Sequence, residues 1–211
     1  SRDHPEFPTI GSHFSLNSTL SGWLLGGQEN FHKHTLKLEW FTPTFWKFVL
    51  MNSMKIGAIN ELPSKNNSPS YIPYNDRFIM GGNGIPYGNV LRGYDDNRVG
   101  PLTTSGNPIG GNTLVKFSTE FRVPFAENPV VYGMIFAEMG NVWSSTDLME
   151  RLSLPRSGPL DLKRSAGVGV RFFMPMIGML GFDFARGFDR VDNNGKFNPE
   201  WKTTLTFGQQ F

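Results

Sequence analysis

The sequence contains no cysteine among its 211 residues, so neither disulfide bonds nor thiolate metal sites can form. Charged residues make up only 18% of the chain, and a net charge of +2 is too small to indicate a nucleic-acid partner. No window approaches eighteen consecutive apolar residues, which excludes a transmembrane helix. The chain opens with Ser1-Arg2-Asp3-His4, without a methionine or an apolar signal core, and we expect it to be a processed or excised piece.

Glycine and aromatic residues are abundant, by contrast. The chain carries 24 glycines, 15 prolines and 19 phenylalanines. This composition favours many strands joined by many turns over a helical bundle.

Polar and apolar residues alternate with a period of two along most of the chain. In the first such segment Phe14, Leu16 and Leu20 alternate with polar neighbours such as His13 and Ser15. The segments with this pattern are 12–24, 36–40, 48–56, 111–124, 131–143, 163–174, 179–188 and 201–211. A period of two places successive side chains on opposite faces of a strand, so the sequence predicts about eight strands.

The strand lengths and connections favour a membrane barrel over a soluble β-sandwich, which is the alternative that alternation alone allows. Most segments are about 10–14 residues long, whereas soluble strands average about 5–6 and tilted membrane strands need about 9–11. Short connections at 42–45, 124–129 and 174–177 separate longer ones at 25–32, 61–110, 144–161 and 189–199. That arrangement is typical of outer-membrane barrels. We expect five tryptophans in the interfacial aromatic girdles, namely Trp23, Trp40, Trp46, Trp143 and Trp201.

Four motifs resemble one known family. Residues 74–80 with Gly81-Gly82-Asn83-Gly84, followed by Leu91-Arg92-Gly93-Tyr94-Asp95-Asp96, resemble the sixth extracellular loop of BamA-type outer-membrane assembly factors, of the bacterial surface antigen superfamily. The start at residues 3–11 (D-x-x-x-F-P-x-x-G), residues 136–143 ending in G-x-V-W, and the aromatic C-terminus at 207–211 are similar to further marks of that family.

The resemblance implies an all-β fold, an antiparallel up-and-down transmembrane β-barrel, of which residues 1–211 are the second half of sixteen strands. It implies a long extracellular loop at 61–110 and a location in the bacterial outer membrane. The implied activity is the folding and insertion of other barrel proteins, without enzymatic activity or a cofactor. The implied partners are outer-membrane lipid, unfolded barrel clients, accessory assembly lipoproteins and upstream POTRA domains, with no nucleic acid; no POTRA-like segment is present in this chain.

Arg92 is the candidate functional residue of the long loop. Taken alone it would be a solvated loop arginine, but the resemblance implies that the loop folds into the lumen and that this arginine pairs with inner-wall acids. Alternation independently places Glu120 and Glu138 on the polar register of neighbouring strands, with Asp183 as a further candidate. An arginine fork suits a carboxylate. We therefore expect a loop lock made of Arg92, Gly93, Tyr94, Glu120 and Glu138, in which Gly93 supplies a positive φ angle or a close approach and Tyr94 packs on the wall.

The C-terminal strand carries a second candidate signal, in Phe207, Gly208 and Phe211. In the family such a strand is recognised by pairing during insertion, and Phe211 would also suit a lipid-facing anchor.

Catalytic and metal sites are not predicted. The four histidines lie within the first 34 residues and have no carboxylate or cysteine at ligand spacing. The sequence Asp95-Asp96-Asn97 lacks the spacing of an EF-hand calcium loop, and no G-x-S-x-G elbow is present.

Two questions remain open from the sequence. An eight-stranded barrel has room only for its own side chains, yet the inward positions are small, as at Ser165, Gly167, Gly169, Gly181, Ala185 and Gly208. Of three arrangements (a closed small barrel with the loop expelled, pairing with another copy, or open edges) we expect the closed barrel. The alternative functions are a two-partner-type protein secretion pore, which shares the loop motif, and a passive small-solute pore.

Overall fold

A computed structural model describes residues 2–4, 6–22, 29–63, 71–85, 87–144, 161–176, 178–191 and 196–207. These residues form eight strands and one short 3₁₀ helix, η2 (Tyr74–Asp76). The strands are β1 (Gly11–Ser21), β2 (Phe31–Pro43), β3 (Val49–Glu61), β4 (Thr113–Glu127), β5 (Val130–Trp143), β6 (Lys163–Met174), β7 (Gly178–Gly187) and β8 (Trp201–Phe207). The all-β prediction is confirmed. No helix in these ranges is long and apolar enough to cross a membrane.

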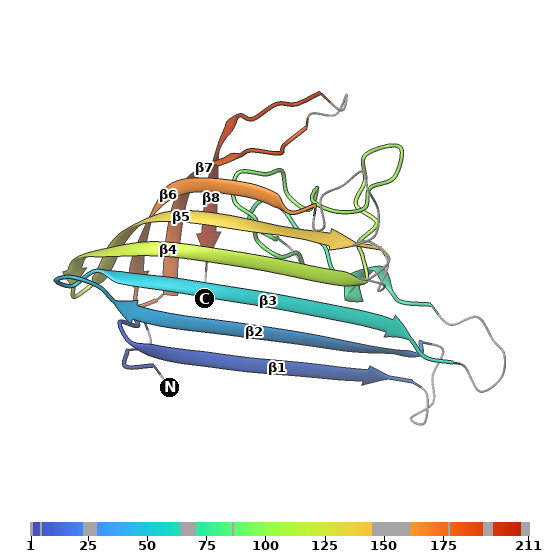
Figure 1. The fold of residues 1–211 in the computed structure, drawn as a ribbon, viewed down its shortest axis with the longest axis horizontal. Coiled ribbons are helices and arrows are strands. Elements are labelled where there is room, and N and C mark those ends of the chain that lie inside the picture. The colour runs from blue at the N-terminus through green and yellow to red at the C-terminus, as the bar shows by residue number, and fades with distance from the viewer. Residues whose placement is uncertain are drawn as a thin grey trace.

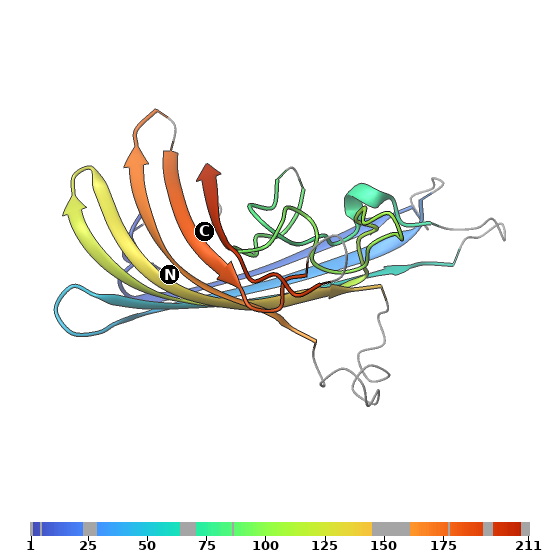
Figure 2. The ribbon, with the colours of Figure 1, turned by 90° about the horizontal axis from the view of Figure 1, so that it is seen from above.

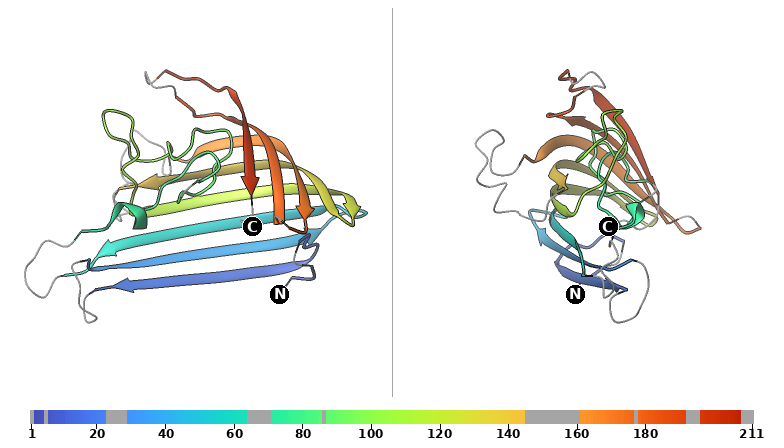
Figure 3. Two further views of the ribbon diagram at one scale, coloured as in Figure 1. Left: turned by 180° about the vertical axis from the view of Figure 1, so that it is seen from behind. Right: turned by 90° about the vertical axis from the view of Figure 1, so that its right-hand side faces the viewer.

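The strands form a single antiparallel sheet in which each pairs with the next along the chain, from β1 to β8 (Figure 1). Viewed from above, the sheet curves into a trough (Figure 2). Within the described residues β1 and β8 do not pair, so the expected closed eight-stranded barrel is wrong. The physical reason is the long connection between β3 and β4, which is not expelled but lies against the concave face, where a narrow closed barrel would leave it no room (Figures 2 and 3).

The two faces of the sheet differ as the alternation predicts. On the convex face, large apolar side chains are exposed, with Phe14 at 64% and Ile135 at 63% of their full area. On the concave face, the small residues Ser165 and Ala185 are buried, together with several charged side chains. A convex apolar face is suited to lipid, and small concave residues leave room for the loop.

Short and long connections lie at opposite ends of the strands (Figure 1). The turn predicted at 124–129 is confirmed but is shorter: β4 continues through Pro124 to Glu127 with a register shift between Pro124 and Ala126, and the chain turns at the cis Asn128–Pro129 bond. A bulge tolerates the proline, which cannot donate to the ladder, and so the strand outlasts it.

The tryptophans divide into two groups. Trp40, Trp46 and Trp201 are exposed, as an interfacial girdle requires, but Trp143 is only 7% exposed, so its assignment to the girdle is wrong. Its strand position adjoins the long loop, whose Gly111 approaches the Trp143 carbonyl and would meet it within 2.3 Å if it carried a Cβ. Trp23 lies outside the described residues.

A buried apolar cluster joins the loop to the wall near the long-connection end. Phe31, Ile59, Leu114 and Val142 come from four strands, and the loop contributes the remaining members: Ile72, Phe78, Met80, Leu91, Tyr94 and Val99. Met80 and Leu91 are completely buried. The segment therefore has a core of its own with the wall, which orders a long connection that lacks regular strands.

Candidate functional site: the loop anchored on the inner wall

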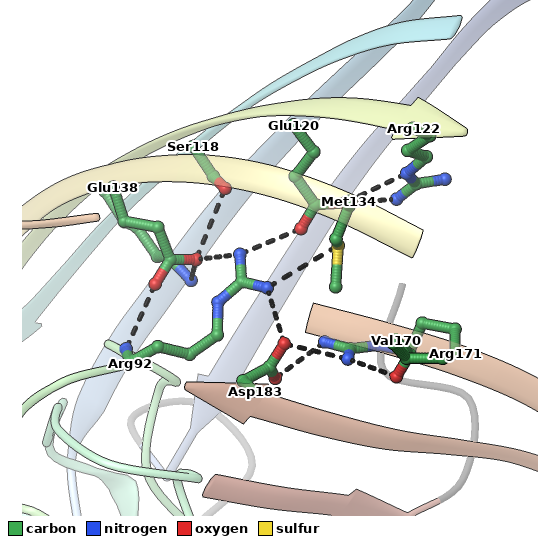
Figure 4. Close-up of polar contacts among 10 residues, drawn as sticks. Arg92, Ser118, Glu120, Arg122, Met134, Glu138, Val170, Arg171 and Asp183 are labelled. Carbon is green, nitrogen blue, oxygen red and sulfur yellow. Dashed lines mark hydrogen bonds and ion pairs between the residues drawn. The ribbon is translucent and has the colours of Figure 1, made fainter. Parts of the chain in front are cut away.

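Arg92 lies at the centre of an ion network between the loop and the concave wall (Figure 4). Its Nη2 donates to Glu120 Oε1 on β4 at 2.8 Å and to Glu138 Oε1 on β5 at 2.7 Å. Nη1 lies 3.5 Å from Asp183 Oδ1 on β7, and the backbone N–H donates to Glu138 Oε2 at 3.0 Å. The structure thus brings together the arginine and all three carboxylates singled out in the sequence, and it does so with an arginine that is only 3% exposed.

The planar guanidinium of Arg92 also lies over an aromatic ring. Its guanidinium carbon lies 3.5 Å from the centroid of the Phe136 ring, a stacked cation–π geometry. A planar fork can stack on the ring and donate sideways to carboxylates at the same time, whereas a lysine ammonium cannot. The site is therefore specific for arginine in shape as well as in charge.

Each carboxylate has a second cationic partner from the wall itself. Glu120 Oε2 accepts from Arg122 at 2.7 and 2.9 Å, and both oxygens of Asp183 accept from Arg171 at 2.8 Å (Figure 4). These carboxylates are buried, so they need such compensation to remain ionised before and after the loop docks. Glu138 is compensated by Lys116 Nζ at 3.1 Å. The wall cations thus balance the three carboxylates, and Arg92 adds further charge-assisted hydrogen bonds to acids that are already paired.

Gly93 brings the loop backbone into direct contact with β7. Its φ is +84°, and a Cβ added there would lie 2.7 Å from the backbone nitrogen of Gly187. The reverse also holds, because a Cβ on Gly187 would lie 2.7 Å from the Gly93 carbonyl oxygen. Both requirements expected of Gly93, a positive φ and a close approach, are present.

Tyr94 packs against the wall and forms hydrogen bonds to two backbone groups. Its hydroxyl donates to the Arg164 carbonyl oxygen of β6 at 2.8 Å and accepts from the Asp189 N–H at 3.3 Å. The side chain is 6% exposed, and burial raises the pKa of this phenol above its usual range. The hydroxyl therefore stays protonated and can donate at any physiological pH.

Asp95 extends the anchorage to the last strand. Its carboxylate accepts from Arg190 Nε at 3.0 Å and pairs with Lys202 of β8. Burial alone would raise the pKa of Asp95, but the hydrogen bonds from Lys202 and Arg190 outweigh it and hold the pKa below its usual range. The four residues Arg92 to Asp95 together touch β4, β5, β6, β7 and β8.

The earlier part of the loop is held by lysines of β2 and β3. Lys33 Nζ donates to the Asp76 carbonyl oxygen at 2.6 Å, and Lys55 Nζ donates to Asn89 Oδ1 at 2.6 Å. The loop is consequently bonded to seven of the eight strands.

Several of these residues were not predicted. Arg122, Arg171 and Lys116 share the inward register with Glu120, Glu138 and Asp183, so alternation contained a signal for them. Gly187 had no such signal, because its role arises from a contact with a residue 94 positions earlier in the chain.

The expected C-terminal signal is only partly described. Phe207 ends β8 and is 55% exposed, whereas Gly208 and Phe211 lie outside the described residues. Within the described ranges, no group of three or more histidine, aspartate or glutamate side chains is arranged to hold a metal ion.

Comparison with known proteins agrees with this architecture. The chain is 26% identical over 199 residues to the outer membrane protein assembly factor BamA of Nitratidesulfovibrio vulgaris, covering 92% of this chain and 23% of that protein. Its fold is similar to the crystal structure of BamA from Haemophilus ducreyi lacking POTRA domains 1–3, with a TM-score of 0.70, 18% identity, and coverage of 97% of this chain and 40% of the other. The chain thus spans less than half the length of either relative.

A family model for the Omp85 superfamily domain matches residues 1–211 without remainder. The convex apolar face, the strand lengths and the position of the loop are those of an outer-membrane barrel wall. The chain belongs to the Omp85 superfamily of outer-membrane β-barrels, and it is similar to part of the BamA proteins named above.

Proposed function

We propose that this chain is the second half of the barrel of an outer-membrane protein assembly factor, which folds other barrel proteins and inserts them into the membrane. The observation that carries the proposal is the loop segment Arg92–Asp95, bonded to five consecutive strands, in a chain that matches the Omp85 family over its whole length.

The role proposed for the loop is that of a lock. Arg92 joins Glu120, Glu138 and Asp183 on three different strands, so it fixes the curvature of the wall as well as the position of the loop. Gly93 and Tyr94 set the depth at which the loop sits. With the loop held in this way, the half-barrel stays rigid while the seam next to β8 remains available for pairing.

The proposed mechanism requires no catalytic residue, cofactor or energy source. Among the described residues β8 pairs with β7 and with no other strand. In the whole barrel we propose that the other edge of β8 is only weakly paired, so that its backbone N–H and C=O groups can become accessible. Such an edge is a template to which another strand can add. A client strand would pair there, and the exposed apolar face would keep the pair in lipid.

The proposal includes an orientation in the membrane. We assign the end with the long connections, including the loop at 61–110, to the cell exterior, and the tight turns to the periplasm. The partners we assign are outer-membrane lipid, unfolded barrel proteins, upstream POTRA domains and accessory assembly lipoproteins.

The test is assembly of a client by the natural full-length protein reconstituted in liposomes, followed by the heat-sensitive electrophoretic mobility of folded barrels. We expect insertion with the unsubstituted protein and with Lys47→Ala, whose ammonium group is exposed and pairs with Glu127. With Arg92→Ala we expect insertion to be at least severalfold slower. Transport of a soluble passenger without barrel insertion would favour a secretion pore instead. Steady conductance of small ions with the loop in place would favour a passive pore.

A further inference from the structure

Three lysines form a continuous row on the concave face of the sheet. The strand register places Lys37 of β2 directly opposite Lys55 of β3, and Lys55 directly opposite Lys116 of β4. Directly opposed side chains in neighbouring antiparallel strands have Cβ atoms about 4.5–5.5 Å apart, and like charges there destabilise the sheet. A row of three cations therefore calls for compensating negative charge.

The two outer lysines, Lys37 and Lys116, each have a carboxylate partner, but the central Lys55 does not. Lys37 Nζ lies 2.9 Å from Glu39 Oε1, and Lys116 Nζ lies 3.1 Å from Glu138 Oε1. Lys55 donates to the neutral Asn89 side chain at 2.6 Å, and no carboxylate of the described residues lies within ion-pair distance of it. Lys55 thus carries the excess positive charge of the row.

The row lines a cavity between the loop and the wall. This cavity has a volume of about 390 Å³ and is lined by all three lysines, by the hydroxyl-bearing Ser53 and by Asn89. Four carboxylates also line it, and each is paired with a cation: Glu39, Glu120, Glu138 and Asp183. Since a water molecule occupies about 30 Å³ of liquid volume, the cavity holds a small oxyanion together with several waters. Among the cationic side chains that line it in the described structure, only Lys55 lacks a carboxylate partner; Arg92 and Arg171 are paired with the acids described above.

We propose that this cavity is a binding site for one small oxyanion of the inorganic phosphate class. The anion accepts hydrogen bonds from the Lys55 ammonium, and it is further attracted by the neighbouring Lys37 and Lys116 ammonium groups; the Ser53 hydroxyl is available as an additional donor. Because Glu39 and Glu138 already neutralise the outer lysines, the row has the charge to hold one anion and not several. The cavity borders the Arg92 lock, because Arg92, Glu120 and Glu138 also line it, but its ligand group is Lys55, which takes no part in the lock. The inference does not depend on the proposed assembly function.

The binding test uses isothermal titration of inorganic phosphate into the detergent-solubilised full-length protein at low ionic strength. We expect saturable binding of one phosphate, weakened about tenfold or more by Lys55→Gln, because a hydrogen bond to a charged group contributes about 1.5–3 kcal/mol. Lys55→Arg, which keeps the charge, retains binding. Lys47→Gln is the matched control, since Lys47 lies in an exposed turn and pairs with Glu127. No saturable binding, or equal affinity in Lys55→Gln, would overturn the proposal.

The Tm of the same proteins provides a second readout, which a misfolded variant would not reproduce. In phosphate-free buffer Lys55→Gln relieves the repulsion within the row, so we expect its Tm to rise. Added phosphate raises the Tm of the unsubstituted protein and leaves that of Lys55→Gln unchanged. An equal phosphate shift in both proteins would contradict a site at Lys55.

Discussion

Replacing Arg92 by alanine removes a side chain that joins three strands to the loop. We expect the substitution to lower the free energy of unfolding and to release the loop from the wall. In the folded protein the guanidinium lies 2.7 Å from Glu138, 2.8 Å from Glu120 and 3.5 Å from Asp183, and it is 3% exposed. Loss of one member of such a buried ionic network costs about 3–5 kcal/mol.

The structure indicates the lower end of that range. After the substitution Glu120 still has Arg122, Asp183 still has Arg171 and Glu138 still has its lysine partner, so no carboxylate is left without a cation. The loss then consists of the arginine's own charge-assisted hydrogen bonds and its stacking on the aromatic ring beneath it. We therefore expect a destabilisation of about 3 kcal/mol.

The assay is equilibrium unfolding in urea in detergent micelles, followed by tryptophan fluorescence, with limited proteolysis by proteinase K as a second readout. Arg92→Ala should shift the unfolding midpoint down and open a cleavage site within the loop. The control is Lys47→Ala, which removes an exposed cation that pairs with Glu127 away from the loop and should leave both readouts almost unchanged. If Arg92→Ala and the control unfold at the same urea concentration with the same proteolytic pattern, the lock does not exist.

Three further predictions concern the neighbouring residues of the loop. Gly93→Ala places a Cβ at a φ of +84° against the backbone of β7. The positive φ alone should lower the free energy of unfolding by about 1–2 kcal/mol in the same urea assay. An unchanged free energy would show that the loop does not pack this closely. Tyr94→Phe removes a buried hydrogen bond to a carbonyl oxygen and should cost about 1 kcal/mol, visible as a lower Tm with the loop still protected; a stability equal to that of the unsubstituted protein would argue against the bond. The Asp95 contact with Lys202 should be pH-dependent: because the pKa of Asp95 is depressed in the folded protein, the stabilisation is present above about pH 4 and is lost as the pH falls below it. A fluorophore on Tyr87→Cys, the sole cysteine in such a variant, reports loop release on acidification, and an unchanged signal down to pH 2 would contradict the assignment.

The strands were predictable because one face of the sheet is apolar and exposed, whereas the other is buried beneath the loop. Phe14 and Ile135 lie in the exposed apolar face and Ser165 in the buried one, as period-two alternation indicates. Strand ends were less predictable: β2 begins at Phe31, five residues before the predicted segment, because His32 and His34 occupy positions where the pattern expects apolar residues. Whether the eight-stranded sheet closes into a barrel could not be predicted from alternation, because closure depends on where the long connection between β3 and β4 lies.

The site was predictable only where a local pattern and the family resemblance coincided. Glu120 and Glu138 were identified because they lie on the inward register of adjacent strands, and Arg92 because of its motif. Gly187 was missed because nothing in its own segment indicates a contact with Gly93. Contacts between distant segments depend on the depth at which the loop docks, which local periodicity does not determine.

The central claim is that the loop is held on the inner wall by a direct interaction between Arg92 and Glu138, and a double-mutant cycle tests it most directly. The free energy of unfolding is measured for Arg92→Ala, for Glu138→Gln and for the double variant, each against the unsubstituted protein. Residues in contact within a buried network couple by about 0.5–3 kcal/mol, and for the charge-assisted bond of 2.7 Å between the two side chains we expect about 2 kcal/mol. A coupling energy of about 2 kcal/mol would support the lock, whereas additive effects, within about 0.3 kcal/mol, would contradict it.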